Sequence, residues 1–330
     1  MKLAKLSSLA AGLLLVACFA LHAQQAPRAI TLQVVALNSA GQPVPDLTEP
    51  DFKVFDNGVP QRIASFRQNQ TDGSHALVIL FDLLNASTSS RGEVWNYMKT
   101  DLSHLLQTKF LYLYLLVDDG SLYPVHALSA EGDRETGDPS WLDNIGPLLD
   151  SAMRKTNRLR PQEFSRDTMD SVGERFNATL RALEEMRARM AAVPGPKDLL
   201  WITYGIPSSM LMVGGGRWDG TPMLRQAGAE FSRCGITLYS ADPGIDLERG
   251  LLERDGLDIL TGATGGYAFG TVDVKLAVER IEAGARTNYT IEYQPPAKNW
   301  NGKYHKLRVT VARKGVHIET QQGYFAGAAS

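Results

Sequence analysis

A single carboxylate ends the most apolar run of this chain. In residues 75–85, HALVILFDLLN, six consecutive apolar residues are followed by Asp82. Such a run is typical of a strand that is buried on both faces of a parallel sheet. In open α/β sheets, ligands bind in the crevice beyond the carboxyl ends of the strands. Asp82 is therefore expected where a metal ion or a partner would bind.

Five further residues are predicted to share this rim of the sheet. Asn85 and Ser87 follow Asp82 in the same loop, and both carry side-chain oxygens. Tyr204 and Asp242 end two other predicted strands, whose carboxyl ends should meet at the same edge. Trp218 lies in a glycine-rich loop after one of these strands, and tryptophan is enriched in binding hot spots. Together they define the predicted partner-binding rim.

Each of these residues also has a structural interpretation that requires no ligand. Asp82 would cap a neighbouring helix or accept hydrogen bonds from backbone N–H groups at the strand end. Tyr204 would fill the space of a lost metal ion, and Trp218 would fold back onto the domain. A cluster of carboxylates at the rim, drawn from Asp118, Asp119 or Asp242, would instead favour a loose Ca²⁺ site.

Several familiar kinds of catalytic and binding site are excluded by spacing. The six histidines form no pair with zinc-ligand spacing and no His-Glu-x-x-His motif. Residues 205–209, GIPSS, lack the second glycine of a nucleophile elbow, and residues 214–216 lack the lysine of a phosphate loop. A net charge of −2 argues against a nucleic-acid binder. We therefore expect a non-enzymatic protein.

The middle of the chain predicts alternating strands and helices. Strands are expected at 76–82, 110–117, 198–204, 236–241 and 266–269, and helices at about 90–107, 140–155, 164–192, 222–233 and 272–284. This alternation is typical of βα units and a mainly parallel sheet. Residues 75–285 are thus predicted to form one α/β domain.

Both ends of the mature chain predict β structure instead. Asp56-Asn57-Gly58 and Asn301-Gly302 are strong hairpin signals between alternating segments. The modules 24–74 and 286–330 are each too small to be stable alone. They are predicted to pack together into a small β-sandwich into which the α/β domain is inserted.

The first residues read as an export signal. Lys2 and Lys5 precede the uncharged apolar stretch 6–21, and Ala23 offers a cleavage site, which gives a signal peptide over 1–23. An alternative is the lipobox-like Leu15-Val16-Ala17-Cys18, in which Cys18 would carry a lipid anchor. Since no second apolar run of spanning length follows, no transmembrane span is expected in the mature chain. The protein is expected in the periplasm, in the outer envelope or outside the cell.

Four blocks of sequence carry a resemblance to a known family. They are DFKVFDNGVPQRIASF (51–66), VILFDLLN (78–85), ATLRALEEM with PGPKDLLWITYGIP (178–186 and 194–207), and YTIEYQPP with GKYHKLRVTVARKGVHIETQQGYF (289–296 and 302–325). In this order they resemble the exported VWFA-related proteins of Acidobacteria, over nearly the whole mature chain. The resemblance implies a von Willebrand factor A-like doubly wound sheet flanked by β segments.

Adhesive A domains hold Mg²⁺ in a loop with the pattern Asp-x-Ser-x-Ser, which leaves one position for a carboxylate of the partner. Here Asp82 matches the aspartate, but Leu84 and Ala86 replace both serines, and Tyr204 replaces an aspartate of another loop. The expectation is therefore a protein partner of unknown identity at the rim, without a cofactor. Adhesion that depends on Mg²⁺ or Ca²⁺ at Asp82, an envelope hydrolase and a scaffold remain as alternatives.

Overall fold

The computed structural model describes residues 29–71, 75–86, 110–128, 145–158, 169–211, 215–242, 251–269 and 273–327. The signal segment 1–23 with Cys18, the rim residue Ser87 and the predicted helix 90–107 lie outside these residues. Within the described part, no helix is both long and apolar enough to span a membrane.

A six-stranded sheet forms the centre of the α/β part, with the strand order β12-β11-β8-β5-β6-β7. All neighbouring strands are parallel except β7, which pairs antiparallel with β6 at one edge. The mainly parallel sheet expected from the sequence is therefore confirmed. Its strands are β5 (Ala76–Asp82), β6 (Leu111–Leu116), β7 (Leu122–His126), β8 (Lys197–Ile202), β11 (Ile236–Ala241) and β12 (Ala268–Phe269).

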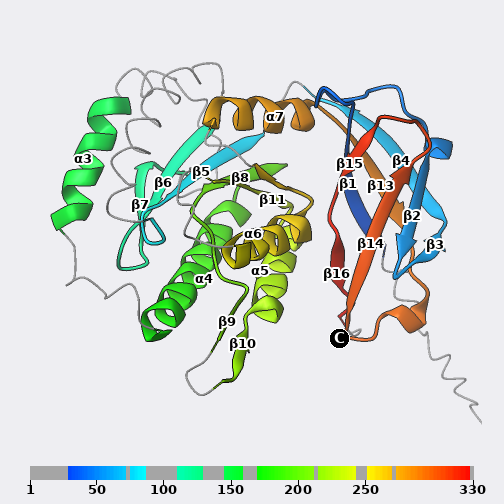
Figure 1. Cartoon of the computed structure of the whole chain (residues 1–330). Helices are drawn as coiled ribbons and strands as arrows, with labels where there is room; N and C mark the ends of the chain where they lie inside the picture. The colour runs from blue at the N-terminus through cyan, green and yellow to red at the C-terminus, as the bar shows by residue number, and fades with distance from the viewer. Residues whose placement is uncertain are drawn as a thin grey trace, which may run out of the picture.

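Helices cover both faces of this sheet (Figure 1). On one face, α4 (Met169–Ala191), α5 (Thr221–Arg233) and α6 (Leu251–Thr264) bury side chains such as Met186 and Phe231. On the other face, α3 (Ile145–Arg158) and α7 (Val274–Arg286) contribute residues such as Leu149 and Ile281. A short hairpin of β9 (Ser209–Leu211) and β10 (Arg217–Asp219) precedes α5. Apolar strands buried on both faces are what this layered arrangement requires.

Helix α6 was not expected from the sequence, and its glycines explain why. Gly256 and Gly262 lie within the helix, where glycine is unfavourable by about 1 kcal/mol relative to alanine. A Cβ atom on Gly256 would lie 2.0 Å from the carbonyl oxygen of Ile206, and one on Gly262 would lie 2.7 Å from the side chain of Gln322. Close packing therefore selects glycine at positions where helix propensity alone would not.

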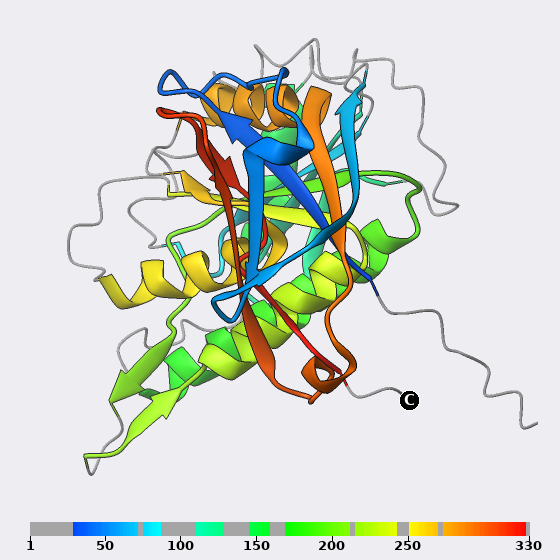
Figure 2. The same ribbon diagram turned by 90° about the vertical axis from the view of Figure 1, so that its right-hand side faces the viewer.

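The remaining strands form two antiparallel four-stranded sheets, with the orders β15-β1-β13-β4 and β16-β14-β2-β3. Strands from the two ends of the chain lie side by side in both sheets (Figure 2). The sheets enclose a separate core that includes Leu32, Phe52 and Tyr289. The strands are β1 (Ile30–Leu37), β2 (Phe52–Asp56), β3 (Val59–Gln61), β4 (Ile63–Gln70), β13 (Thr287–Tyr293), β14 (Tyr304–Val311), β15 (His317–Glu319) and β16 (Gly323–Phe325), with short 3₁₀ helices at Glu49–Asp51 and Ala297–Asn299.

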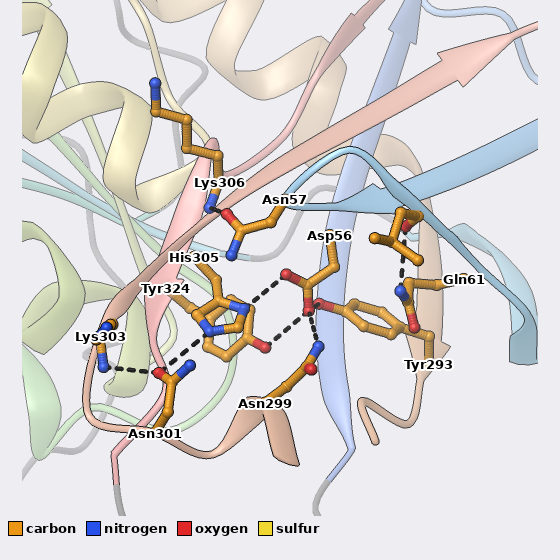
Figure 3. A network of polar contacts seen from close by, with 11 residues as sticks. Asp56, Asn57, Gln61, Tyr293, Asn299, Asn301, Lys303, His305, Lys306 and Tyr324 are labelled. Atoms are coloured by element: carbon orange, nitrogen blue, oxygen red, sulfur yellow. Dashed lines mark hydrogen bonds and ion pairs between the residues drawn. The ribbon is translucent and has the colours of Figure 1, made fainter. Parts of the chain in front are cut away.

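A buried polar network around Asp56 ties the two ends of the chain together (Figure 3). The Nδ1 atom of His305 lies 2.7 Å from Oδ1 of Asp56, and the Tyr324 hydroxyl donates to Oδ2 at 2.9 Å. Tyr293 and Asn299 also donate to Oδ2, each at 3.3 Å. Because Asp56 belongs to the N-terminal segment and its partners to the C-terminal one, the network fixes how the two segments pair.

Candidate functional site

Asp82 is the last residue of β5, the strand that lies between β6 and β8 in the sheet. This is the central position that the apolar run predicts. The side chain is not open to solvent, since Asp82 is only 1% exposed. A partner docking on the surface would therefore not contact it directly, and the prediction of Asp82 as a rim contact needs correction to a buried position beneath the rim.

The carboxylate of Asp82 is held by donors from within the protein. The backbone N–H of Asn85 donates to Oδ1 at 2.9 Å, and the Asn85 amide donates to Oδ2 at 2.8 Å. The Thr203 hydroxyl, which follows β8, donates to the same Oδ2 at 2.7 Å. This arrangement agrees in part with the ligand-free interpretation, since one backbone N–H bonds Asp82 at the strand end and two side-chain donors complete the set.

The amide of Asn85 has a second bond that closes the network. Its Nδ2 atom also lies 3.0 Å from Oγ1 of Thr179, a fully buried residue inside α4. One nitrogen thus bridges a carboxylate and a hydroxyl, as a bound cation would. Burial raises the pKa of Asp82, while the hydrogen bonds from Asn85 and Thr203 act in the opposite direction.

These residues do not fit a Mg²⁺ site. Mg²⁺ demands a near-octahedral set of oxygens, usually with carboxylates among them. Here Asp82 supplies the carboxylate, Thr179 and Thr203 supply neutral hydroxyls, and the Asn85 nitrogen lies between them. Within the described residues, no group of three or more His, Cys, Asp and Glu side chains could hold a metal ion.

A hollow of about 430 Å³ opens at the rim beside this network. One wall is the turn after β6, where the carboxylate of Asp119 accepts from the backbone of Ser121 at 2.8 Å. The other wall is the first half of α4. The lining residues carry charges of both signs: Leu84, Asp118, Asp119, Glu174, Arg175, Asn177, Ala178 and Arg181.

The other predicted rim residues are mostly turned inward. Asn85 is buried in the Asp82 network, and Tyr204 belongs to the apolar core on the α3–α7 face. Trp218 packs edge-on against Phe176 of α4, with 4.6 Å between the ring centroids, so it folds back onto the domain. Asp242 is half-buried at the end of β11. The rim residues that the structure describes are therefore mainly supports rather than contact points.

Sequence reasoning missed the α4 side of the hollow. Glu174, Asn177 and Arg181 form no known motif and were not among the predicted rim residues. Their i, i+3, i+7 spacing places them on one side of the helix, which is the signal that could have identified a shared surface. Thr203 was also missed as a partner of Asp82, because a lone threonine after a strand has no distinctive pattern.

Comparison of the sequence with protein-family models finds no match, and no curated protein matches it. Among solved structures, proximal thread matrix protein 1 of the mussel byssus is similar with a TM-score of 0.37 and 11% identity, over 66% of this chain and 49% of that one. The chain thus spans about half the length of the mussel protein.

Two bacterial surface proteins are also similar in structure. The vWF domain of the type V pili tip protein Mfa5 from Porphyromonas gingivalis has a TM-score of 0.36 and 9% identity, over 63% of this chain and 93% of that one. The PilB minor pilin of Streptococcus sanguinis has a TM-score of 0.34 and 12% identity, over 65% and 63% of the two chains. With all three TM-scores below 0.5, the functional proposal rests on the geometry of this chain alone.

Proposed function

We propose that this chain is an exported, non-enzymatic protein-binding protein of the adhesion type, with a von Willebrand factor A-like α/β part. Its protein partner docks at the carboxyl-end rim of the sheet, without a metal ion. The observation that carries the proposal is the hollow between the β6–β7 turn and α4, directly beside a carboxylate whose oxygens are bonded by the protein itself.

Position and chemistry both support the hollow as the docking point. It lies beyond the carboxyl ends of the strands, where open α/β sheets bind their ligands. Asp118 and Asp119 face it from one wall, and Arg175 and Arg181 from the other. Separated charges of opposite sign favour a partner with a complementary charge pattern, which gives specificity more than raw affinity.

Partner binding is expected to be independent of metal ions because the protein's own hydrogen-bond donors already occupy the Asp82 carboxylate. A cation that displaced the Asn85 amide would break its bonds to Asp82 and Thr179 and would gain only one carboxylate. Partner binding is therefore expected to persist in a chelator. This separates the proposal from adhesion that depends on Mg²⁺ or Ca²⁺.

Site-specific photo-cross-linking tests the docking point. A photoreactive residue placed at Asn177, exposed on α4 and lining the hollow, should cross-link a partner in the native envelope, with or without a chelator. The matched control is Ala188, which is exposed on the same helix about 16 Å further along and on the same side. Equal products from both positions, or products that vanish in the chelator, would refute docking at a metal-free rim.

Export is tested on the mature N-terminus. Mass spectrometry of the protein from the native envelope is expected to find a chain that begins near Gln24, after cleavage at Ala23. A lipid-modified Cys18 at the N-terminus would instead establish an anchored lipoprotein, and an intact Met1 would contradict export.

A further inference from the structure

A second cavity of about 570 Å³ lies at the opposite end of the parallel sheet. It is formed between the amino ends of β8 and β11 and the outer face of the sandwich sheet that contains β1, β4 and β13. Ligand sites of this size occur preferentially at the junction of two structural units. None of the residues that form it belongs to the rim.

The sandwich wall of this cleft carries a connected chain of amides and hydroxyls across three strands. The Asn69 amide on β4 donates to Oδ1 of Asn288 at 2.8 Å and to Oγ1 of Thr290 at 2.7 Å, both on β13. The Thr290 hydroxyl donates in turn to Oε1 of Gln33 on β1, at 3.2 Å. Each side chain thus fixes the orientation of the next, so the polar groups are held in place before any ligand arrives.

The facing wall contains a buried carboxylate. The side chain of Asp198, the second residue of β8, is 10% exposed and lies 3.2 Å from Nε2 of His75. Its register partner in β5 is Leu77, a core residue, so an apolar side chain at position 198 would extend the same core. Burial raises the pKa of Asp198 to about 6, in spite of the nearby His75. Packing alone does not account for a carboxylate at this position.

We propose that this cleft binds a neutral, polyhydroxylated ligand of the size of a mono- or disaccharide. Each sugar hydroxyl both donates and accepts. The amide of Gln33 offers both functions, while the Asn69 oxygen and the Asp198 carboxylate accept.

Two of the charged side chains that line the cleft are already engaged within the protein: Arg233 pairs with Glu230, and the Lys197 ammonium donates to the carbonyl oxygen of Val193 at 2.8 Å. Arg67 and Asp198 face the same space with opposite charges, so the lining suits a neutral ligand better than a net anion or a net cation. The inference is independent of docking at the rim.

Calorimetric titration of the mature chain with cellobiose, maltose and diacetylchitobiose tests the inference, with glucose 6-phosphate and glutamate as charged probes. At least one neutral disaccharide is expected to bind in the millimolar range or tighter. Gln33→Ala, at an exposed position, and Asp198→Asn, of nearly the same shape, should each weaken that binding about tenfold or more. Asn177→Ala at the rim should leave it unchanged.

Three results would overturn the proposal: no binding of any neutral sugar, binding of the charged probes alone, or sugar binding that both cleft variants leave intact. Thermal unfolding of each variant shows whether it is folded, and Gln33→Ala keeps the test valid if Asp198→Asn is destabilised. Because the cross-linking experiment addresses residues at the other end of the sheet, failure of either experiment leaves the other interpretable.

Discussion

Asp82 lies at the carboxyl end of β5 and Asp198 at the amino end of β8, so two buried aspartates occupy opposite ends of one sheet. Asn85 and Thr203 surround Asp82 with neutral donors and close its site. Asp198 has His75 beside it and lines a cavity of about 570 Å³. A carboxylate at the carboxyl ends of the strands, where such folds bind ligands, can thus be fully bonded by the protein itself. A carboxylate at the amino ends, which usually serve stability, can instead line a cavity.

The Asp56 network in the sandwich is fully enclosed, and the two aspartate sites can be compared with it. Its loss is expected to have the largest effect on the free energy of unfolding. Asp56→Ala would leave His305, Tyr293 and Tyr324 without their common acceptor in a buried site. We expect a loss of about 3–5 kcal/mol in the free energy of unfolding, as for other broken buried pairs. Urea unfolding of this variant and of Val59→Ala, an exposed control, measures the difference. A loss below about 1 kcal/mol would show that the network does not join the two ends of the chain.

The free energy of unfolding should depend on pH because the carboxyl group of Asp198 is buried. Its folded-state pKa of about 6 exceeds the ordinary value of 3.8, so the folded protein binds more protons between these two values. The protonated Asp198 carboxyl group contributes its full stabilisation of the folded state below pH 3.8, and this contribution is lost as the pH rises through about 6. Over that window the wild type should lose about 3 kcal/mol relative to Asp198→Asn.

Direct NMR titration of the Asp198 carboxyl carbon checks the same prediction without a variant. A midpoint near 6 agrees with burial as the main cause of the raised pKa. A midpoint near that of a free aspartate, about 4, would mean that the cleft is well solvated. The sites of Asp82 and Asp198 would then differ in shape but not in how strongly burial affects the carboxyl group.

The isosteric change Asp82→Asn tests how much the hydrogen bonds to this carboxylate contribute to stability. An asparagine at this position can accept at one atom only, so its amide group would face a donor from Asn85 or Thr203. We expect a loss of about 2 kcal/mol near neutral pH, in the range for one unsatisfied buried group. Asp198→Asn should cost less than Asp82→Asn under the same conditions, because three hydrogen bonds from Asn85 and Thr203 converge on Asp82, whereas only Thr237 and the nearby His75 act on Asp198 against its burial. Equal losses of unfolding free energy for Asp82→Asn and Asp198→Asn, measured by urea unfolding, would show that the two sites do not differ in this way.

The smallest effect is expected on the surface of the hollow. Asn177→Ala and Arg181→Ala are exposed changes on α4 and should alter the free energy of unfolding by no more than about 0.5 kcal/mol. They should nevertheless reduce partner capture at the rim, because they remove polar contacts from its α4 wall. Wild-type capture by a variant with both changes would place the docking surface elsewhere.

The sheet was predictable because its signals are long and local. The apolar run over 76–82 and the alternation of strands with helices define a buried parallel strand in the centre, and β5 has the same bounds. Hairpin signals such as Asp56-Asn57-Gly58 were also reliable, since Asn57 and Gly58 adopt positive φ angles of 48° and 80°. Helix α6 was missed because its glycines serve contacts with distant residues.

The site was less predictable, because it depends on contacts that span many residues. Asp82 and Asn85 were identified from one loop, but Thr203 lies 121 residues away and Thr179 lies inside a helix. Whether a polar residue at a strand end is open or enclosed depends on such partners. Asp198 follows a lysine at the start of an apolar strand, and nothing in that pattern indicates His75 beside it.

Isothermal titration calorimetry with Mg²⁺ and with Ca²⁺ tests most directly whether the carboxylate of Asp82 is satisfied by the protein itself. The wild-type chain is expected to give no heat beyond dilution with either ion, since binding would require breaking the bonds of Asn85 to Asp82 and Thr179. A saturable heat that disappears in Asp82→Asn would contradict the account and establish a metal site at the rim.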